Sequence, residues 1–97
     1  MDPDLPDLTI ADVVVSTAGR EKGQLFYVLE TDGDAVLLVD GKGRSIEKPK
    51  RKNSKHVRKI LRSETRVATK LRDGDKVLNS ELRRDLAYFR QELQSQT

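Results

Sequence analysis

The feature that most constrains the fold is a pair of short apolar runs separated by a tight turn. Residues 25–29 (LFYVL) and residues 36–39 (VLLV) are rich in the aromatic, branched and β-branched side chains that favour strands. Between them, Asp32-Gly33-Asp34 supplies the positive φ angles that a tight hairpin turn needs. Neither run alternates strictly between apolar and polar residues, which indicates strong twist or burial on both faces of the sheet. We therefore predict a β-hairpin at the centre of a small β domain.

A polar loop precedes this hairpin. Residues 13–15 (VVV) predict an earlier strand, and residues 16–23 (STAGREKG) place Gly19 and Gly23 around Arg20 and Lys22. Glycine permits left-handed turns and a close approach of the backbone to a ligand, and the two cations would suit a phosphate. An ordinary hairpin loop explains the same residues, so the loop alone does not decide the function.

These residues together resemble the KOW motif, which is a strand, a glycine-containing loop and a second strand. The match consists of VVVS at 13–16, AGREKG at 18–23 and FYV at 26–28, with Gly23 as the central glycine of the motif. The continuation VLLVDGK at 36–42 and KPK at 48–50 resembles KOW-containing large-subunit ribosomal proteins and, more closely, short bacterial KOW-domain RNA-binding proteins. The resemblance covers residues 11–61. It implies a five-stranded, Src-homology-3-like barrel whose strand-connecting loops contact RNA.

Length and composition limit the remaining choices. The chain has 97 residues, 35% hydrophobic and 36% charged, which is enough for one modest core. It has no cysteine, so disulfides and thiolate chemistry are excluded, and a reducing compartment fits. No apolar run approaches the length of a membrane span and the N-terminus is acidic, so we expect a cytoplasmic protein. We divide it into an acidic disordered lead-in at 1–9, a KOW-type barrel with its basic segment at 10–62 and a helical extension at 63–97.

The positive charge of the chain is concentrated in one segment. Residues 42–62 contain ten Lys or Arg side chains and a single carboxylate, Glu47, which gives this segment a net charge of +9. Because the whole chain carries +3, the remaining residues together carry −6. A solvated charged loop is one explanation, but like charges repel one another, and a polyanionic partner relieves that repulsion.

Nucleic acid is the polyanion that fits best. A membrane surface would need an apolar face to insert, and residues 48–55 (KPKRKNSK) offer none. RNA is preferred over DNA because of the family resemblance and because no helix-turn-helix or zinc-finger pattern is present. Aromatic residues for base stacking are scarce, so we expect phosphate-dominated binding. The predicted RNA-binding residues are Gly19, Arg20, Lys22, Gly23, Lys42, Arg44, Lys48, Lys50, Arg51, Lys52, Lys55, His56, Arg58 and Lys59.

The rest of the chain supplies two more strands and two helices. Alternation predicts a fourth strand at residues 45–47 that Pro49 ends, and the family comparison favours a closing strand near residues 56–59. Ser63 can cap a helix at 64–72, which residues 73–75 (DGD) stop, and Asn79 or Ser80 can cap a second helix ending near residue 93. In the second helix, one apolar stripe is formed by Leu82, Leu86, Phe89 and Leu93. We expect a helical hairpin packed on the barrel or on itself, with docking of a protein partner or a second copy of the chain on the stripe as the alternative.

Catalysis is not predicted. The chain has one histidine, His56, which between lysines is interpreted as a surface phosphate or ribose contact rather than a metal ligand. Neither Asp-Gly-Asp turn has the other ligand positions of a calcium loop, and Gly41-Lys42-Gly43 lacks the surroundings of a nucleotide-binding loop. We therefore expect a non-enzymatic RNA-binding protein without a cofactor, directed at structured ribosomal RNA or the ribosome. The alternative is a protein-interaction module of the transcription-elongation type that contacts polymerase or another protein.

Overall fold

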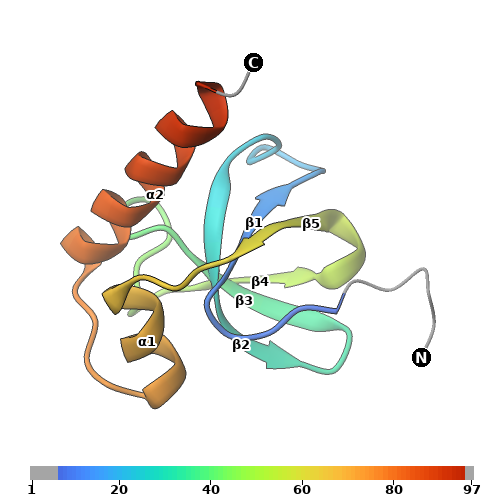
Figure 1. Ribbon diagram of the computed structural model, residues 1–97. Helices are drawn as coiled ribbons and strands as arrows, with labels where there is room; N and C mark the ends of the chain where they lie inside the picture. The colour runs from blue at the N-terminus through green and yellow to red at the C-terminus, as the bar shows by residue number, and fades with distance from the viewer. Residues whose placement is uncertain (1–6, 96–97) are drawn as a thin grey trace.

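The protein folds into one five-stranded antiparallel sheet followed by two helices (Figure 1). A computed structural model describes residues 7–95. The elements are β1 (Asp12–Ser16), β2 (Leu25–Asp32), β3 (Ala35–Val39), β4 (Lys50–Asn53), the short 3₁₀ helix η1 (Ser54–His56), β5 (Val57–Arg62), α1 (Arg66–Asp73) and α2 (Asn79–Gln94). The sheet order is β4-β3-β2-β1-β5. The predicted class, mainly β with a helical C-terminal extension, is confirmed. Closure of the sheet into a barrel stays a prediction, because β4 and β5 lie at the two ends of this order.

The central hairpin is the β2–β3 pair. Asp32 pairs with Ala35 across the turn, and Gly33 has the predicted positive φ, +59°. Both faces of the hairpin are buried: Leu25 and Tyr27 belong to one apolar cluster, and Phe26 and Val28 belong to another on the other face. Burial on both faces is thus the reason that the two runs do not alternate, as the sequence indicated.

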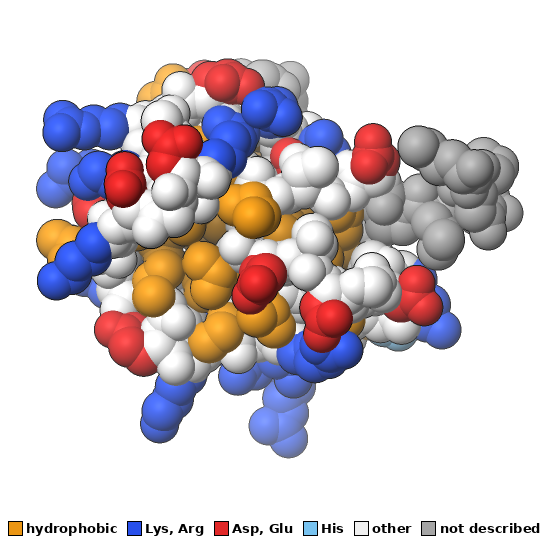
Figure 2. Space-filling model, turned by 90° about the horizontal axis from the view of Figure 1, so that it is seen from below, with side chains coloured by type: hydrophobic (Ala, Val, Ile, Leu, Met, Phe, Trp, Pro, Cys, Tyr) orange, Lys and Arg blue, Asp and Glu red, His pale blue; other side chains and the backbone are white. Residues whose placement is uncertain are grey.

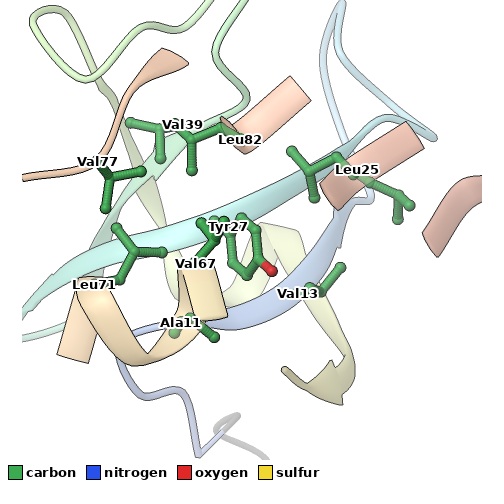
Figure 3. Close-up of a cluster of buried hydrophobic side chains, with 11 residues drawn as sticks. Ala11, Val13, Leu25, Tyr27, Val39, Val67, Leu71, Val77 and Leu82 are labelled. Carbon is green, nitrogen blue, oxygen red and sulfur yellow. The ribbon is translucent and has the colours of Figure 1, made fainter. Parts of the chain in front are cut away.

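The two helices cover one of these faces. Leu82 and Leu86 of α2 are fully buried beside Tyr27, and Phe89 meets the Tyr27 ring edge-on with 6.5 Å between ring centroids. Figure 3 shows the Tyr27 ring among side chains from both the strands and the helices. The expected packing of the helices on the sheet is therefore what the structure has, and Leu82 and Leu86 are not available to a protein partner.

The fourth strand lies later in the chain than predicted. Residues 45–48 form a turn, closed by the N–H of Lys48 donating to the carbonyl of Ser45, and Pro49 precedes the strand instead of ending it. The backbone of Ile46 donates to the side chain of Asn79 over 2.9 Å, so this segment is held by α2 and not by a neighbouring strand. The charged strand β4 pairs with β3 and forms one edge of the sheet.

Several element ends also differ from the predictions. The cap of α1 is Thr65, whose hydroxyl accepts from the N–H of Ala68, because Ser63 is buried and bonds to Tyr27 instead. The closing strand β5 begins at Val57 and is longer than predicted, and α2 begins at Asn79 without a side-chain cap from Asn79 or Ser80. The predicted stop of α1 is confirmed, since Gly74 is left-handed with φ of +74°.

The acidic lead-in predicted at 1–9 falls outside the described residues for positions 1–6. The part within them joins the fold earlier than expected, since Leu8 packs against the second apolar cluster and the N–H of Thr9 donates to the carboxylate of Asp12 over 2.8 Å. Among residues 7–95, no helix combines the length and the apolar character needed to cross a membrane.

Candidate nucleic-acid interface

An open depression of ≈ 1290 Å³ lies where the β1–β2 loop, the β3–β4 loop, β4 and α2 meet. We call it the basic hollow. Its lining contains seven cationic side chains, two carboxylates, Glu21 and Asp40, and the imidazole of His56. The seven cations are Arg20, Lys42, Arg44, Lys50, Arg51, Lys52 and Arg90. Segments far apart in the sequence thus place an excess of positive charge around one concave surface.

The basic hollow collects most but not all of the predicted RNA-binding residues. Those that line it are Gly19, Arg20, Gly23, Lys42, Arg44, Lys50, Arg51, Lys52 and His56. Those that do not line it are Lys22, Lys48, Lys55, Arg58 and Lys59. Lys59 instead forms an ion pair with the buried carboxylate of Asp12, with 3.4 Å between Nζ and Oδ2.

The face seen from below in Figure 1 lacks the excess of positive charge that surrounds the basic hollow. Figure 2 shows there that hydrophobic side chains are exposed among acidic and basic side chains of mixed arrangement. A smaller depression of ≈ 610 Å³ has Ile46, Val77 and Leu78 in its lining, and Leu78 is 51% exposed. This second site is apolar and has no concentration of a single charge.

The β1–β2 loop is shaped by its two glycines and supported by a lysine. Gly19 and Gly23 have φ angles of +81° and +89°, which side chains rarely tolerate. The N–H of Gly23 donates to the carbonyl of Ser16 over 2.8 Å, so this amide closes the loop and is not available to a ligand. The ammonium of Lys52 donates to the carbonyl of Ala18 over 2.7 Å and to the hydroxyl of Ser16. Lys52 therefore holds the loop in place from β4.

An ion pair connects this loop to the β3–β4 loop. Arg44 donates to both carboxylate oxygens of Glu21, from Nη2 over 2.7 Å and from Nε over 3.2 Å. The hydrogen bond from Arg44 is the main cause that holds the pKa of Glu21 below its ordinary value, and the same bond raises the pKa of Arg44. Asp40 orders the second loop by accepting from the N–H groups of Lys42 and Arg44 at 2.9 and 2.8 Å.

These contacts sort the cations of the hollow into two groups. Arg44 is neutralised by Glu21, Lys52 supports a loop, and Arg51 forms an ion pair with Asp32. Within residues 7–95 the other cations of the hollow make no ion pair; they are Arg20, Lys42, Lys50 and Arg90. The second group carries the charge that an anionic ligand would meet.

Arg90 was not predicted from the sequence. It follows Arg83 by seven residues, which places the two on the same face of α2, and Arg83 donates to the carbonyl of Gly41 in the β3–β4 loop over 2.6 Å. The seven-residue spacing of Arg83 and Arg90 is visible in the sequence. Which loop this face of the helix contacts depends on the tertiary fold.

Comparison of the sequence with models of known protein families and with curated proteins gives no match. In the part of the chain that the structure describes, no group of three or more His, Cys, Asp or Glu side chains is placed to hold a metal ion. The chemistry that the hollow itself offers is electrostatic and hydrogen-bonding recognition of an anion.

Proposed function

We propose that this protein binds structured RNA, with ribosomal RNA or the ribosome as its target, and that the basic hollow receives the sugar–phosphate backbone. The observation that carries the proposal is the convergence of cations without an ion pair: Arg20 from the β1–β2 loop, Lys42 from the β3–β4 loop and Lys50 from β4. Gathering like charges costs free energy through their mutual repulsion, and a phosphate chain offsets that cost. Each cation that meets a phosphate also releases condensed counterions from the RNA.

The placement of the aromatic side chains supports phosphate contacts over the reading of bases. Phe26 and Tyr27 are buried and Phe89 is partly buried, so Tyr88 is the one exposed aromatic side chain, and it does not line the hollow. Phe, Tyr and Trp side chains on which unpaired bases could stack are thus missing from the lining of the hollow, whereas backbone contacts need only the cations that are present. The resemblance of residues 11–61 to KOW-domain proteins supports RNA as the nucleic acid.

The test compares two triple variants that remove the same charge. The first is Arg20→Ala with Lys42→Ala and Lys50→Ala, in the hollow. The matched control is Arg66→Ala with Lys76→Ala and Arg84→Ala, three exposed cations that neither line the hollow nor form an ion pair within residues 7–95. A triple alanine variant of the consecutive cations Lys50, Arg51 and Lys52 would be a less specific test, because Lys52 also supports the β1–β2 loop.

Binding of a short RNA stem–loop is measured by fluorescence anisotropy over a range of salt concentrations. We expect the hollow variant to lose affinity on the order of 100-fold, with a log–log salt slope lower by about 2 to 3, because three phosphate contacts are removed. The control variant should lose roughly threefold at most through its lower net charge. Absence of salt-dependent binding by the unaltered protein, or equal losses in the two variants, would refute the proposal.

The target is tested by crosslinking the protein to RNA in its own cells and sequencing the attached fragments. We expect ribosomal RNA fragments to dominate. Dominance of messenger or other non-ribosomal RNA would contradict the ribosomal target while leaving RNA binding in place.

The second candidate is a protein-interaction module of the transcription-elongation type. The observation in its favour is the depression that Ile46, Val77 and Leu78 line, because a contiguous apolar surface of this kind can mark a protein contact. In that case Leu78→Asp would abolish partner capture, and the hollow variant would retain it. Loss of RNA binding in the hollow variant, with RNA binding retained in Leu78→Asp, would decide against this candidate.

A further inference from the structure

The helix α2 is fixed to the sheet by a partly buried polar cluster. The hydroxyls of Tyr27 and Thr65 each donate to the same carboxylate oxygen of Asp85, both over 2.6 Å. Tyr27 and the neighbouring Leu82 and Leu86 are almost completely shielded from solvent. A helix held by partly buried hydrogen bonds and buried leucines at once has little freedom to turn or slide.

The first turns of α2 are also in direct contact with a wall of the hollow. Gly41 in the β3–β4 loop has a φ of +77°, and a Cβ at this position would lie 2.2 Å from the backbone oxygen of Asn79. The guanidinium of Arg83 donates to the carbonyl of Gly41. The helix and the loop that carries Lys42 therefore form one packed unit, and the backbone further along this face of α2 has a fixed position relative to the hollow.

Arg90 lies two turns after Arg83 on this face and lines the hollow. The positions three and four residues away, where a carboxylate would pair with it along the helix, hold Leu86, Ala87, Leu93 and Gln94. It makes no ion pair with any residue between 7 and 95. Within the described residues, no carboxylate lies at ion-pair distance from its guanidinium, so its positive charge adds to that of the sheet loops.

We propose that Arg90 is an RNA-binding residue and that α2 is one wall of the RNA site, so that the bound RNA contacts the loops of the sheet and the helix together. The inference rests on the function proposed above. Arginine suits this position because its planar guanidinium presents several fixed donors and can bind two oxygens of one phosphate. The helical extension then has a direct part in recognition in addition to covering the core.

The experiment compares Arg90→Ala with Arg84→Ala, which removes the same charge from the same helix at an exposed position outside the hollow. Affinity for the RNA stem–loop is measured against salt, and circular dichroism confirms that each variant is folded. We expect Arg90→Ala to weaken binding roughly tenfold and to lower the salt slope by about 1, while Arg84→Ala changes affinity by no more than about twofold. Arg90→Lys should restore most of the salt slope and only part of the affinity, since it keeps the charge without the planar donors.

Equal effects of Arg90→Ala and Arg84→Ala, in a protein whose unaltered form binds RNA in a salt-dependent way, would overturn the role of Arg90 and leave the proposed function in place. Failure of the unaltered protein to bind would overturn both.

Discussion

The hydrogen bond from Tyr27 to Asp85 makes a sharp prediction for stability. Tyr27→Phe removes a fully buried hydroxyl that donates to the carboxylate over 2.6 Å and lies 2.9 Å from the hydroxyl of Ser63. The aromatic ring stays, so apolar packing is nearly unchanged and the loss is one of polar contacts. This single group connects the centre of the sheet to α2.

The magnitude follows from the partners that are left behind. A hydrogen bond to a charged group contributes about 1.5–3 kcal/mol, and an orphaned buried carboxylate oxygen adds to the cost of its loss. Here Asp85 keeps the bond from Thr65, also 2.6 Å, so the carboxylate is not left without a donor. We therefore expect a decrease of about 2 kcal/mol in the free energy of unfolding, which corresponds to about 8–16 °C in Tm for a domain of this size.

Urea and thermal unfolding followed by far-ultraviolet circular dichroism measure this directly, and the absence of tryptophan makes circular dichroism the better probe. Tyr88→Phe is the matched control, because the same hydroxyl is removed from a side chain that is 56% exposed. The control should change stability by less than about 0.5 kcal/mol. A loss below about 0.5 kcal/mol for Tyr27→Phe would refute the view that this bond fastens the helix.

Three other predictions concern the turn next to α2 and the titrating groups. Gly41→Ala should destabilise the fold by about 2 kcal/mol or more in urea unfolding, because its Cβ would lie 2.2 Å from the backbone of α2. The control is Gly43→Ala, whose Cβ would meet nothing within 4 Å. This control should change the free energy of unfolding by no more than about 0.5 kcal/mol. Burial and the adjacent carboxylate of Asp85 raise the pKa of Tyr27. Above a pH of about 10 the unfolded chain loses a phenolic proton that the folded state keeps, so the free energy of unfolding should fall as the pH rises above that value. This decrease should be smaller in Tyr27→Phe, which lacks the titrating group. Arg44 lowers the pKa of Glu21 below 4.5, so the ion pair stabilises the fold above that pH, and its contribution is lost as the pH falls through the folded-state pKa. In Glu21→Gln the free energy of unfolding should therefore decrease less on acidification. An unchanged decrease at low pH would count against a stabilising role of the pair.

The parts of the fold that were predicted are those specified locally. The Asp32-Gly33 turn needs only its own residues to direct a hairpin, and the apolar runs on either side fit a sheet that is buried on both faces. The end of α1 at Gly74 is local in the same way. These elements agree with the sequence because backbone preference and hydrophobic pattern point to one structure.

The fourth strand was misplaced because its signal is not local. Three alternating residues at 45–47 are too few to specify a strand, and Ile46 is drawn to Asn79, a partner 33 positions later. The true strand, KRKN, has none of the side chains typical of strands. Lysines on an edge strand discourage pairing with other chains, and a strand of this kind is recognised only once its neighbour is known.

The candidate site could be predicted only as a concentration of charge. The density of lysine and arginine in residues 42–62 is visible in the sequence, and five of these ten side chains do line one hollow. Their division into paired and unpaired cations is not visible, because Glu21 reaches Arg44 across 23 positions and Lys52 reaches Ala18 across 34. The contribution of Arg90 depends on where α2 crosses the loops, which is a property of the packed core.

RNA binding in the basic hollow is tested most directly by a nuclear magnetic resonance titration of the ¹⁵N-labelled full chain with the RNA stem–loop. We expect amide shift changes concentrated at residues 18–24, 40–44 and 50–53 and around Arg90, fading as salt is raised. Shift changes confined to α1 and residues 74–79, or none at low salt, would contradict the claim that the basic hollow binds RNA.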